Sequence, residues 1–248
     1  MLFEPTSREQ ISPSIRTAED PAFVRALFSR IAARYDLANT ILSGGLDWFW
    51  RRRAAAQVRH WAPARLLDLA TGSGALLETI QAACPGIWAV GADFCPPMLG
   101  QARARRGLPR LVAADGLRLP FADRSFDALT VAFGLRNMAS WSGAVQEMAR
   151  VLRPGGHLLV LDVSLPRRAL LRAAYRVYLH RGLPLVAAVV CGERRAYDYL
   201  GESIESFPRG EAMSALLEKC GFRAPTAEEL TGGIVSLYTA ERASARRA

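Results

Sequence analysis

Short apolar runs alternate with helical stretches along most of this chain, and this alternation restricts its fold more than any other feature. Strands that alternate with helices of roughly ten residues form parallel βαβ units with right-handed crossovers. The sequence therefore predicts an α/β fold with a doubly wound sheet. Strands are expected at residues 65–69, 87–92, 110–114, 126–133, 157–163, 223–228 and 234–240. Helices are expected at 23–35, 48–61, 75–83, 97–106, 142–152, 169–190 and 210–220, and Pro154-Gly155-Gly156 predicts a turn before the fifth strand.

The size and composition of the chain predict a single domain. It has 248 residues, half of them hydrophobic and 22% charged, which supplies a sizeable core and excludes a largely disordered chain. The longest apolar run, Leu183–Cys191, contains Pro184. It is less than half of the ~20 residues that span a bilayer, so we expect no membrane span. We predict a polar leader at 1–22, one domain at 23–242 and a frayed tail at 243–248.

The net charge of +9 comes almost entirely from arginine, since Lys219 is the only lysine. A basic surface suits the phosphates of nucleic acid or of anionic lipid. The arginines are spread along the chain, however, and a compositional bias explains them equally well. The histidines and cysteines lack the spacing of metal ligands, so we predict no metal site. The leader has neither the apolar stretch of a signal peptide nor the composition of a transit peptide, and we expect a bacterial cytoplasmic enzyme.

A glycine loop and three acids point to a ligand site. The segment Asp68–Gly74 ends the first predicted strand with two glycines, which let the backbone turn sharply beside a ligand at a helix N-terminus. The G-x-G-x-x-G dinucleotide pattern fails, because its third position is Leu77. Asp68, Asp93 and Asp115 lie at the ends of successive strands, where open parallel sheets bind ligands. Asp93 suits ribose hydroxyls and Asp115 an adenine amino group, while a tight turn without a ligand stays open as an alternative.

Four further segments make the chain resemble a known family. They are Phe28–Asn39, Phe133–Asn137, Tyr197–Ile204 with Phe207-Pro208, and Thr231–Val235. With the glycine loop they resemble the UbiE/MenG family of quinone C-methyltransferases, from about Phe23 to Ala240. The resemblance implies a class I methyltransferase fold, which is Rossmann-like, with seven strands in the order 3-2-1-4-5-7-6 and strand 7 antiparallel. It also implies S-adenosylmethionine as methyl donor, no metal and a quinol substrate.

The resemblance also indicates how the domain is divided and where the cofactor binds. Residues 23–62 look like the family's N-terminal helical lid, and 165–207 like a helical insertion on the substrate side. Thr71, Ala75 and Ala132 depart from residues more usual in the family. Taken with the loop and the strand ends, the resemblance gives this cofactor-binding set: Asp68, Gly72, Ser73, Gly74, Asp93, Asp115 and Gly116.

Methylation of a quinol carbon requires a ring hydroxyl to lose its proton, and the resulting phenolate requires stabilisation. Arg136 and Asn137, just after the fourth strand, are the candidates, because arginine stays charged and offers a fork of donors to an oxyanion. A salt bridge to a nearby acid is the alternative for Arg136. Tyr35 and Asn39 are expected to orient cofactor or substrate, with helix capping as the alternative. Three roles stay open for Leu183–Val190. The segment is expected to line an entrance for the prenyl tail, to rest on the bilayer interface, or to belong to the core.

The function predicted from these residues is C-methylation of a prenylated quinol. Demethylmenaquinol is favoured over a benzoquinol precursor of ubiquinone. The alternatives are an RNA methyltransferase, a methyltransferase of a soluble phenolic metabolite, and a cofactor-binding assembly protein without turnover. Against the RNA alternative, the loop at 133–137 lacks an Asn/Asp-Pro-Pro-aromatic motif and holds no cysteine. We expect no nucleic-acid partner, and leave open a homodimer and contact with the inner face of the membrane.

Overall fold

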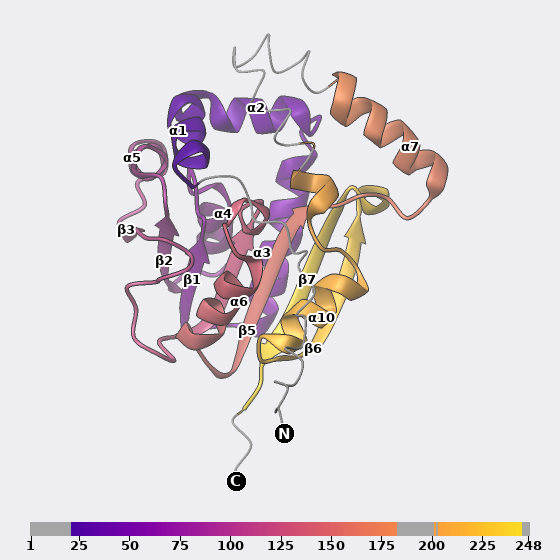
Figure 1. The fold of residues 1–248 in the computed structure, drawn as a ribbon. Coiled ribbons are helices and arrows are strands. Elements are labelled where there is room, and N and C mark those ends of the chain that lie inside the picture. The colour runs from indigo at the N-terminus through magenta and orange to yellow at the C-terminus, as the bar shows by residue number, and fades with distance from the viewer. Residues whose placement is uncertain (1–20, 183–200, 202, 245–248) are drawn as a thin grey trace, which may run out of the picture.

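The computed structural model describes residues 21–182, 201 and 203–244, which form one seven-stranded sheet with helices on both faces (Figure 1). The strand order is β3-β2-β1-β4-β5-β7-β6. β7 is antiparallel to both of its neighbours, while the other pairs are parallel. The predicted fold and strand order are confirmed. The strands are β1 (Arg65–Leu69), β2 (Trp88–Asp93), β3 (Leu111–Ala113), β4 (Phe126–Ala132), β5 (Leu152–Val163), β6 (Phe222–Leu230) and β7 (Val235–Arg242).

The helices divide between the two faces because neighbouring strand residues point to opposite sides. Leu66 and Ala128 face a core built with α3 (Leu46–Trp61), α4 (Ala75–Ala83) and α5 (Pro96–Arg106). Leu67 and Leu129, one residue further along, face a core built with α6 (Trp141–Val151) and α10 (Glu211–Lys219). Both faces of the sheet are therefore buried, as expected for parallel strands.

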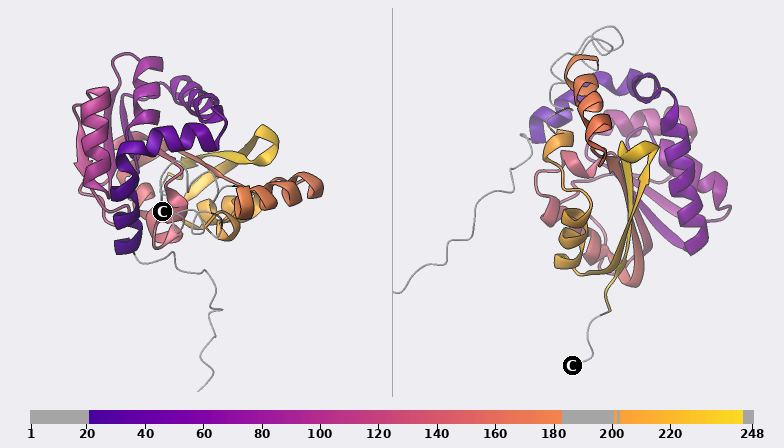
Figure 2. Two further views of the ribbon diagram at one scale, coloured as in Figure 1. Left: turned by 90° about the horizontal axis from the view of Figure 1, so that it is seen from above. Right: turned by 90° about the vertical axis from the view of Figure 1, so that its right-hand side faces the viewer.

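The register of the central strands brings their carboxyl ends to one edge. Leu69 of β1 pairs with Ala92 of β2 and with Val131 of β4, so the loops that follow these strands begin side by side. Asp93 pairs with Ala113 of β3, which places the next loop at the same edge. Three more helices of the described chain are α1 (Pro21–Ile31), α2 (Tyr35–Leu42) and α7 (Ala169–Val177). α1 and α2 lie across this edge, above the ends of the strands (Figures 1 and 2).

Two predicted elements differ from the structure. The helix expected at 23–35 is broken, because the 3-10 turn η1 (Ala32–Arg34) separates α1 from α2. The turn expected at Pro154–Gly156 lies inside β5 instead, where the pairing with β4 jumps from Phe126–Leu152 to Ala128–His157. Gly155 has φ of +77°, so the segment forms a bulge rather than a break between helix and strand.

The segment after β5 is described only in part. α7 is followed by the π-helical turn η3 (Tyr178–Gly182), which ends the described part of the helix expected at 169–190. Several predicted segments lie outside the described residues: the tail entrance Leu183–Val190, the segment Tyr197–Leu200, the leader up to residue 20 and the tail from 245. Within the described residues no helix has both the length and the apolar character to cross a membrane.

Candidate active site

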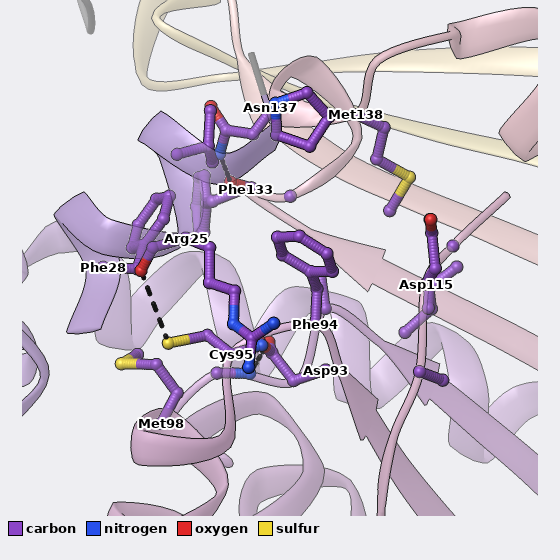
Figure 3. Close-up of a pocket in the computed structure, with 18 of the residues that line it drawn as sticks. Arg25, Phe28, Asp93, Phe94, Cys95, Met98, Asp115, Phe133, Asn137 and Met138 are labelled. Carbon is purple, nitrogen blue, oxygen red and sulfur yellow. Dashed lines mark hydrogen bonds between the residues drawn. The ribbon is translucent and has the colours of Figure 1, made fainter. Parts of the chain in front are cut away.

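A pocket that is partly open to solvent lies at the carboxyl edge of the sheet (Figure 3). The loops after β1, β2, β3 and β4 form its floor and walls, and α1 and the start of α2 cover it. It is mostly apolar, with carboxylates and backbone groups at a few points. Its lining includes Arg25, Phe28, Tyr35, Gly72, Asp93, Phe94, Met98, Asp115, Gly116, Phe133, Asn137 and Met138.

Asp93 is the carboxylate most firmly held in the pocket. Its Oδ2 accepts the Gly72 N–H at 2.8 Å, and its Oδ1 accepts the Cys95 N–H at 2.8 Å. Burial raises the pKa of Asp93, and these two backbone bonds oppose the rise. Each oxygen keeps a second lone-pair site. A pair of ligand hydroxyls is the group that such a fixed carboxylate binds best, so the predicted ribose role fits this geometry.

Asp115 and Gly116 border the same pocket on the loop next to Asp93, where the Ala114 N–H donates to the Asp93 carbonyl at 2.9 Å. Asp115 is exposed, and its Oδ1 accepts the Leu117 N–H at 2.9 Å. A Cβ at Gly116 would lie 2.9 Å from Met138 Sδ, so a larger residue there would displace the Met138 side chain. Phe94, Met98 and Met138 supply flat and flexible apolar walls, and the Arg25 guanidinium lies 5.6 Å from the centre of the Phe94 ring. These walls suit a heteroaromatic ring such as adenine.

Three predicted cofactor residues, Asp68, Ser73 and Gly74, do not line the pocket but build the glycine loop behind it. Asp68 is 1% exposed and accepts the Thr71 and Thr130 hydroxyls, both at 2.6 Å. Burial raises the pKa of Asp68 to about 6. Gly74 has φ of +82° and opens α4, where a Cβ would lie 2.3 Å from Leu108.

Ser73 is joined to the helical cover by an ion-pair cluster. Its hydroxyl donates to Asp36 Oδ1 of α2 at 2.5 Å. Arg106 of α5 donates to Asp36 Oδ2 at 2.8 Å, to the Ser73 carbonyl at 2.9 Å and to Glu78 at 2.9 Å. Burial acts to raise the pKa of Asp36, but the bonds from Ser73 and Arg106 and the arginine charges outweigh it and lower the pKa. Sequence reasoning missed Asp36 and Arg106, because 70 residues separate them.

The structure brings Tyr35, Asn39 and Arg136 into electrostatic contact. Tyr35 lines the pocket, and burial raises the pKa of its phenol, while a hydrogen bond with Asn39 and the positive charge of Arg136 lower it. Tyr35 therefore stays a neutral hydrogen-bonding group at neutral pH. Asn39 lies one helical turn away on α2 and is not among the described residues that line the pocket.

Arg136 and Asn137 belong to the 3-10 turn η2 (Leu135–Asn137) after β4, but they have different surroundings. Asn137 lines the pocket, and its Nδ2 donates to the Phe133 carbonyl at 3.3 Å (Figure 3). Arg136 is 7% exposed and lies behind the lining, where Nη1 donates to Asp162 Oδ1 at 2.6 Å and to the Phe133 carbonyl at 2.7 Å. The structure thus contains the salt bridge considered as the alternative for Arg136.

No group of three or more His, Cys, Asp or Glu side chains within the described ranges is arranged to hold a metal ion. The donors that do converge are carboxylates and backbone groups beside an apolar space. This set fits an adenosyl group: Asp93 suits the ribose, and the apolar walls with Asp115 suit the base. The expectation that Asp93, Asp115, Gly72 and Gly116 meet at one site therefore agrees with the arrangement of the pocket.

Comparisons with known proteins connect this pocket to one family. The sequence model of the ubiE/COQ5 methyltransferase family matches residues 16–242. The demethylmenaquinone methyltransferase of Thermus thermophilus is 46% identical over 220 residues, which cover 87% of this chain and 100% of the relative. The enzyme of the same name from Mycobacterium tuberculosis is 44% identical over 220 residues, covering 89% of this chain and 92% of the relative.

Solved structures show the same fold at lower sequence identity. A SAM-dependent methyltransferase of Thermotoga maritima has a TM-score of 0.62 and 18% identity, covering 88% of this chain and 99% of that chain. Human N-acetylserotonin methyltransferase, in complex with SAM, has a TM-score of 0.63 and 17% identity, covering 90% of this chain and 60% of that chain.

Proposed function

The chain belongs to the ubiE/COQ5 methyltransferase family, and from this membership and its pocket we propose that it methylates a ring carbon of demethylmenaquinol. It is an S-adenosylmethionine-dependent methyltransferase with the class I fold. One observation supports the proposal most strongly. The family match at residues 16–242 includes every residue that lines the pocket, from Pro21 to Ala139.

The cofactor is assigned to the side of the pocket that holds Asp93. We propose that Asp93 binds the ribose hydroxyls, that the Gly72 loop lies along the amino-acid portion, and that Asp115 binds the adenine amino group. When bound, S-adenosylmethionine supplies an electrophilic methyl group on its sulfonium. The chain then has two tasks, to orient the acceptor carbon and to exclude water. α1 and α2 perform the second task, because they cover the pocket.

The remaining part of the pocket, near Asn137, is assigned to the quinol. Tyr35, whose ring lies near Gly72, stands between the two parts. Tyr35 stays neutral and Asn137 carries an amide, so both are suited to hydrogen-bond a ring hydroxyl. Loss of that hydroxyl's proton places negative charge on the oxygen and on the neighbouring ring carbon. Behind the Phe133–Asn137 loop, Arg136 is paired with Asp162, and the electric field of its guanidinium still lowers the pKa of Tyr35. We propose that this field favours the phenolate.

The proposal extends to the place of action. A prenylated quinol resides in a bilayer, so we propose that the enzyme is cytoplasmic and makes peripheral contact with the inner face of the membrane.

Quinone profiling tests the proposed substrate. In a bacterium that lacks its own enzyme of this family, demethylmenaquinone should accumulate, and expression of this chain should restore menaquinone. An Asp93→Ala variant, expressed to the same level, serves as the matched control and should not restore it. If menaquinone is not restored but a methylated benzoquinone of ubiquinone synthesis is, the acceptor assignment is wrong. If neither changes, quinone methylation itself is excluded.

A further inference from the structure

Exposed apolar side chains gather at the end of the molecule that holds the pocket. Of the nine large hydrophobic side chains exposed among the described residues, eight belong to two segments. The first segment, here called the shoulder, is α2 with the start of α3, and its exposed side chains are Leu37, Ile41, Leu46, Trp48 and Phe49. Trp48 is 60% exposed. An apolar cluster of this kind on a folded surface marks an interaction site.

The second segment is α7, which exposes Leu170, Leu171 and Val177. Leu170 and Val177 form the side here called the α7 face, whereas Leu171 lies toward Gly232. No residue of α7 is buried, and Leu170 is 86% exposed. Leu170 and Val177 are seven residues apart and share one side of the helix, while Arg168 and Arg172, four apart, share another. α7 is thus an amphipathic helix whose apolar side is largely uncovered by the described part of the chain.

The shoulder and the α7 face lie at the same end of the molecule. α2 and α7 are both above the carboxyl ends of the strands in two perpendicular views (Figures 1 and 2). A hydrogen bond from the Tyr178 hydroxyl to the Leu42 carbonyl, at 2.9 Å, connects the turn after α7 to the end of α2. The pocket lies beneath α1 and the start of α2, next to the shoulder.

The excess positive charge at the end of the molecule that holds the pocket indicates which partner binds there. Residues 165–182 contain five arginines and no aspartate or glutamate. Two of the five face carboxylates from elsewhere, Arg167 with Glu229 and Arg176 with Glu205, so positive charge remains in excess. On the shoulder, the Arg52 guanidinium lies 4.7 Å from the centre of the Trp48 ring. Tryptophan and leucine between arginines are typical of segments that lie in the interface of an anionic bilayer.

Two other partners, a second copy of the chain and a nucleic acid, fit this surface less well than an anionic bilayer. A second copy would bring the same excess of positive charge against this face, which opposes pairing. A nucleic acid would neutralise the arginines but would leave the apolar side chains without a partner.

We propose that the shoulder and the α7 face together form a docking surface for anionic lipid. Docking would place the pocket beside the acyl layer, so that a quinol with a long tail enters without crossing water. The inference rests on the proposed function for its purpose, because only a lipid-soluble acceptor requires such entry. The binding of lipid itself is measured without any acceptor.

Vesicle flotation tests the docking surface. Wild-type protein should bind vesicles of phosphatidylglycerol and phosphatidylcholine mixed in about equal parts, bind weakly to pure phosphatidylcholine, and release with salt. The double variant Leu170→Gln, Val177→Gln should bind the mixed vesicles about tenfold or more weakly, and Trp48→Gln should also weaken binding. Arg168→Gln with Arg172→Gln should weaken binding to the mixed vesicles by about tenfold. Trp88→Gln is the matched control and should bind like the wild type, since Trp88 is the exposed hydrophobic residue outside both segments.

Turnover separates this inference from the proposed function. The Leu170→Gln, Val177→Gln variant should methylate a soluble short-tail demethylmenaquinol at the wild-type rate, but a long-tail quinol in vesicles about tenfold or more slowly. Wild-type protein that turns over both acceptors without binding vesicles would overturn the docking surface and leave the proposed function intact. Vesicle binding without turnover of either acceptor would overturn the proposed function instead. A dimer in light scattering that the same variant abolishes, without vesicle binding, would assign this face to a second copy.

Discussion

Replacement of Asp36 by asparagine tests how the helical cover is held over the pocket. Asp36 accepts one bond from Ser73 at 2.5 Å and one from Arg106 at 2.8 Å, and its side chain is 26% exposed. A hydrogen bond to a charged group contributes about 1.5–3 kcal/mol when buried. Partial exposure reduces this figure, and asparagine keeps one acceptor, so we expect Asp36→Asn to cost about 1–2 kcal/mol. That loss corresponds to opening of α2 that is about 5- to 30-fold more frequent.

Hydrogen exchange measured by mass spectrometry detects this opening. Peptides that cover α2 should exchange about 5- to 30-fold faster in Asp36→Asn, while peptides from α6 should not change. Affinity for S-adenosylmethionine should fall as well, because Tyr35 lies beside Asp36. Arg103→Gln, an exposed position on the same helix as Arg106, is the control and should exchange like the wild type. Unchanged exchange of α2 in Asp36→Asn would refute the idea that this cluster holds the cover.

The pH dependence of the same cluster follows from the lowered pKa of Asp36. A carboxyl group whose pKa is lower in the folded state stabilises that state above its unfolded pKa, and loses this effect as pH falls through the folded value. Protection of α2 should therefore stay level from pH 8 down to about 5, and be lost only in acid below the ordinary value of 3.8. Loss of protection near pH 6 would show that another group controls α2.

Three further predictions concern single carboxylates and the buried arginine. Asp93→Ala should weaken S-adenosylmethionine binding by about 1–3 kcal/mol in titration calorimetry, and Asp115→Ala should weaken it by less, because Asp115 is exposed. Equal affinity of the wild type and Asp93→Ala would refute the ribose assignment. Arg136→Lys should keep cofactor affinity but slow single-turnover methyl transfer about ten- to a thousand-fold, whereas a purely structural arginine predicts a lower melting temperature at a normal rate. Asp68→Asn should raise the free energy of unfolding above pH 6 by about 1–3 kcal/mol. The reason is that the folded state holds the Asp68 proton up to a pKa of about 6, so the wild type loses stability as pH rises from 3.8 to that value. A scan of melting temperature against pH in which the variant is less stable than the wild type at pH 8 would contradict this.

The sheet could be predicted from sequence because its determinants are local. Each strand is a short apolar run between turn residues, as in β1 (Arg65–Leu69), which was expected with the bounds the structure has. These runs do not determine the order of the strands, which the family resemblance implied. The break between α1 and α2 was missed because helical spacing of apolar residues continues across it, and the 3-10 turn carries no proline or glycine.

The residues of the site could be predicted from sequence only where a polar or charged side chain stands at the end of a strand. Asp93 was found because the end of β2 is visible in the sequence. Asp36 and Arg106 were missed because their pairing joins α2 to α5 through tertiary packing. Arg136 shows a further limit: sequence placed it after β4, but its burial beside Asp162 of β5 depends on a neighbour 26 residues away. For such residues, packing decides between a salt bridge and a direct role in the pocket.

Methyl transfer by the purified protein tests the proposed reaction most directly. The chain is incubated anaerobically with S-adenosylmethionine that carries an isotopically labelled methyl group and with demethylmenaquinol, and the product is examined by mass spectrometry. We predict one labelled methyl on the ring carbon of menaquinol, none when the quinone is kept oxidised, and a rate that falls in Asp93→Ala at limiting cofactor. Absence of label on the reduced ring, from protein that binds S-adenosylmethionine in calorimetry, would contradict quinol C-methylation by this chain.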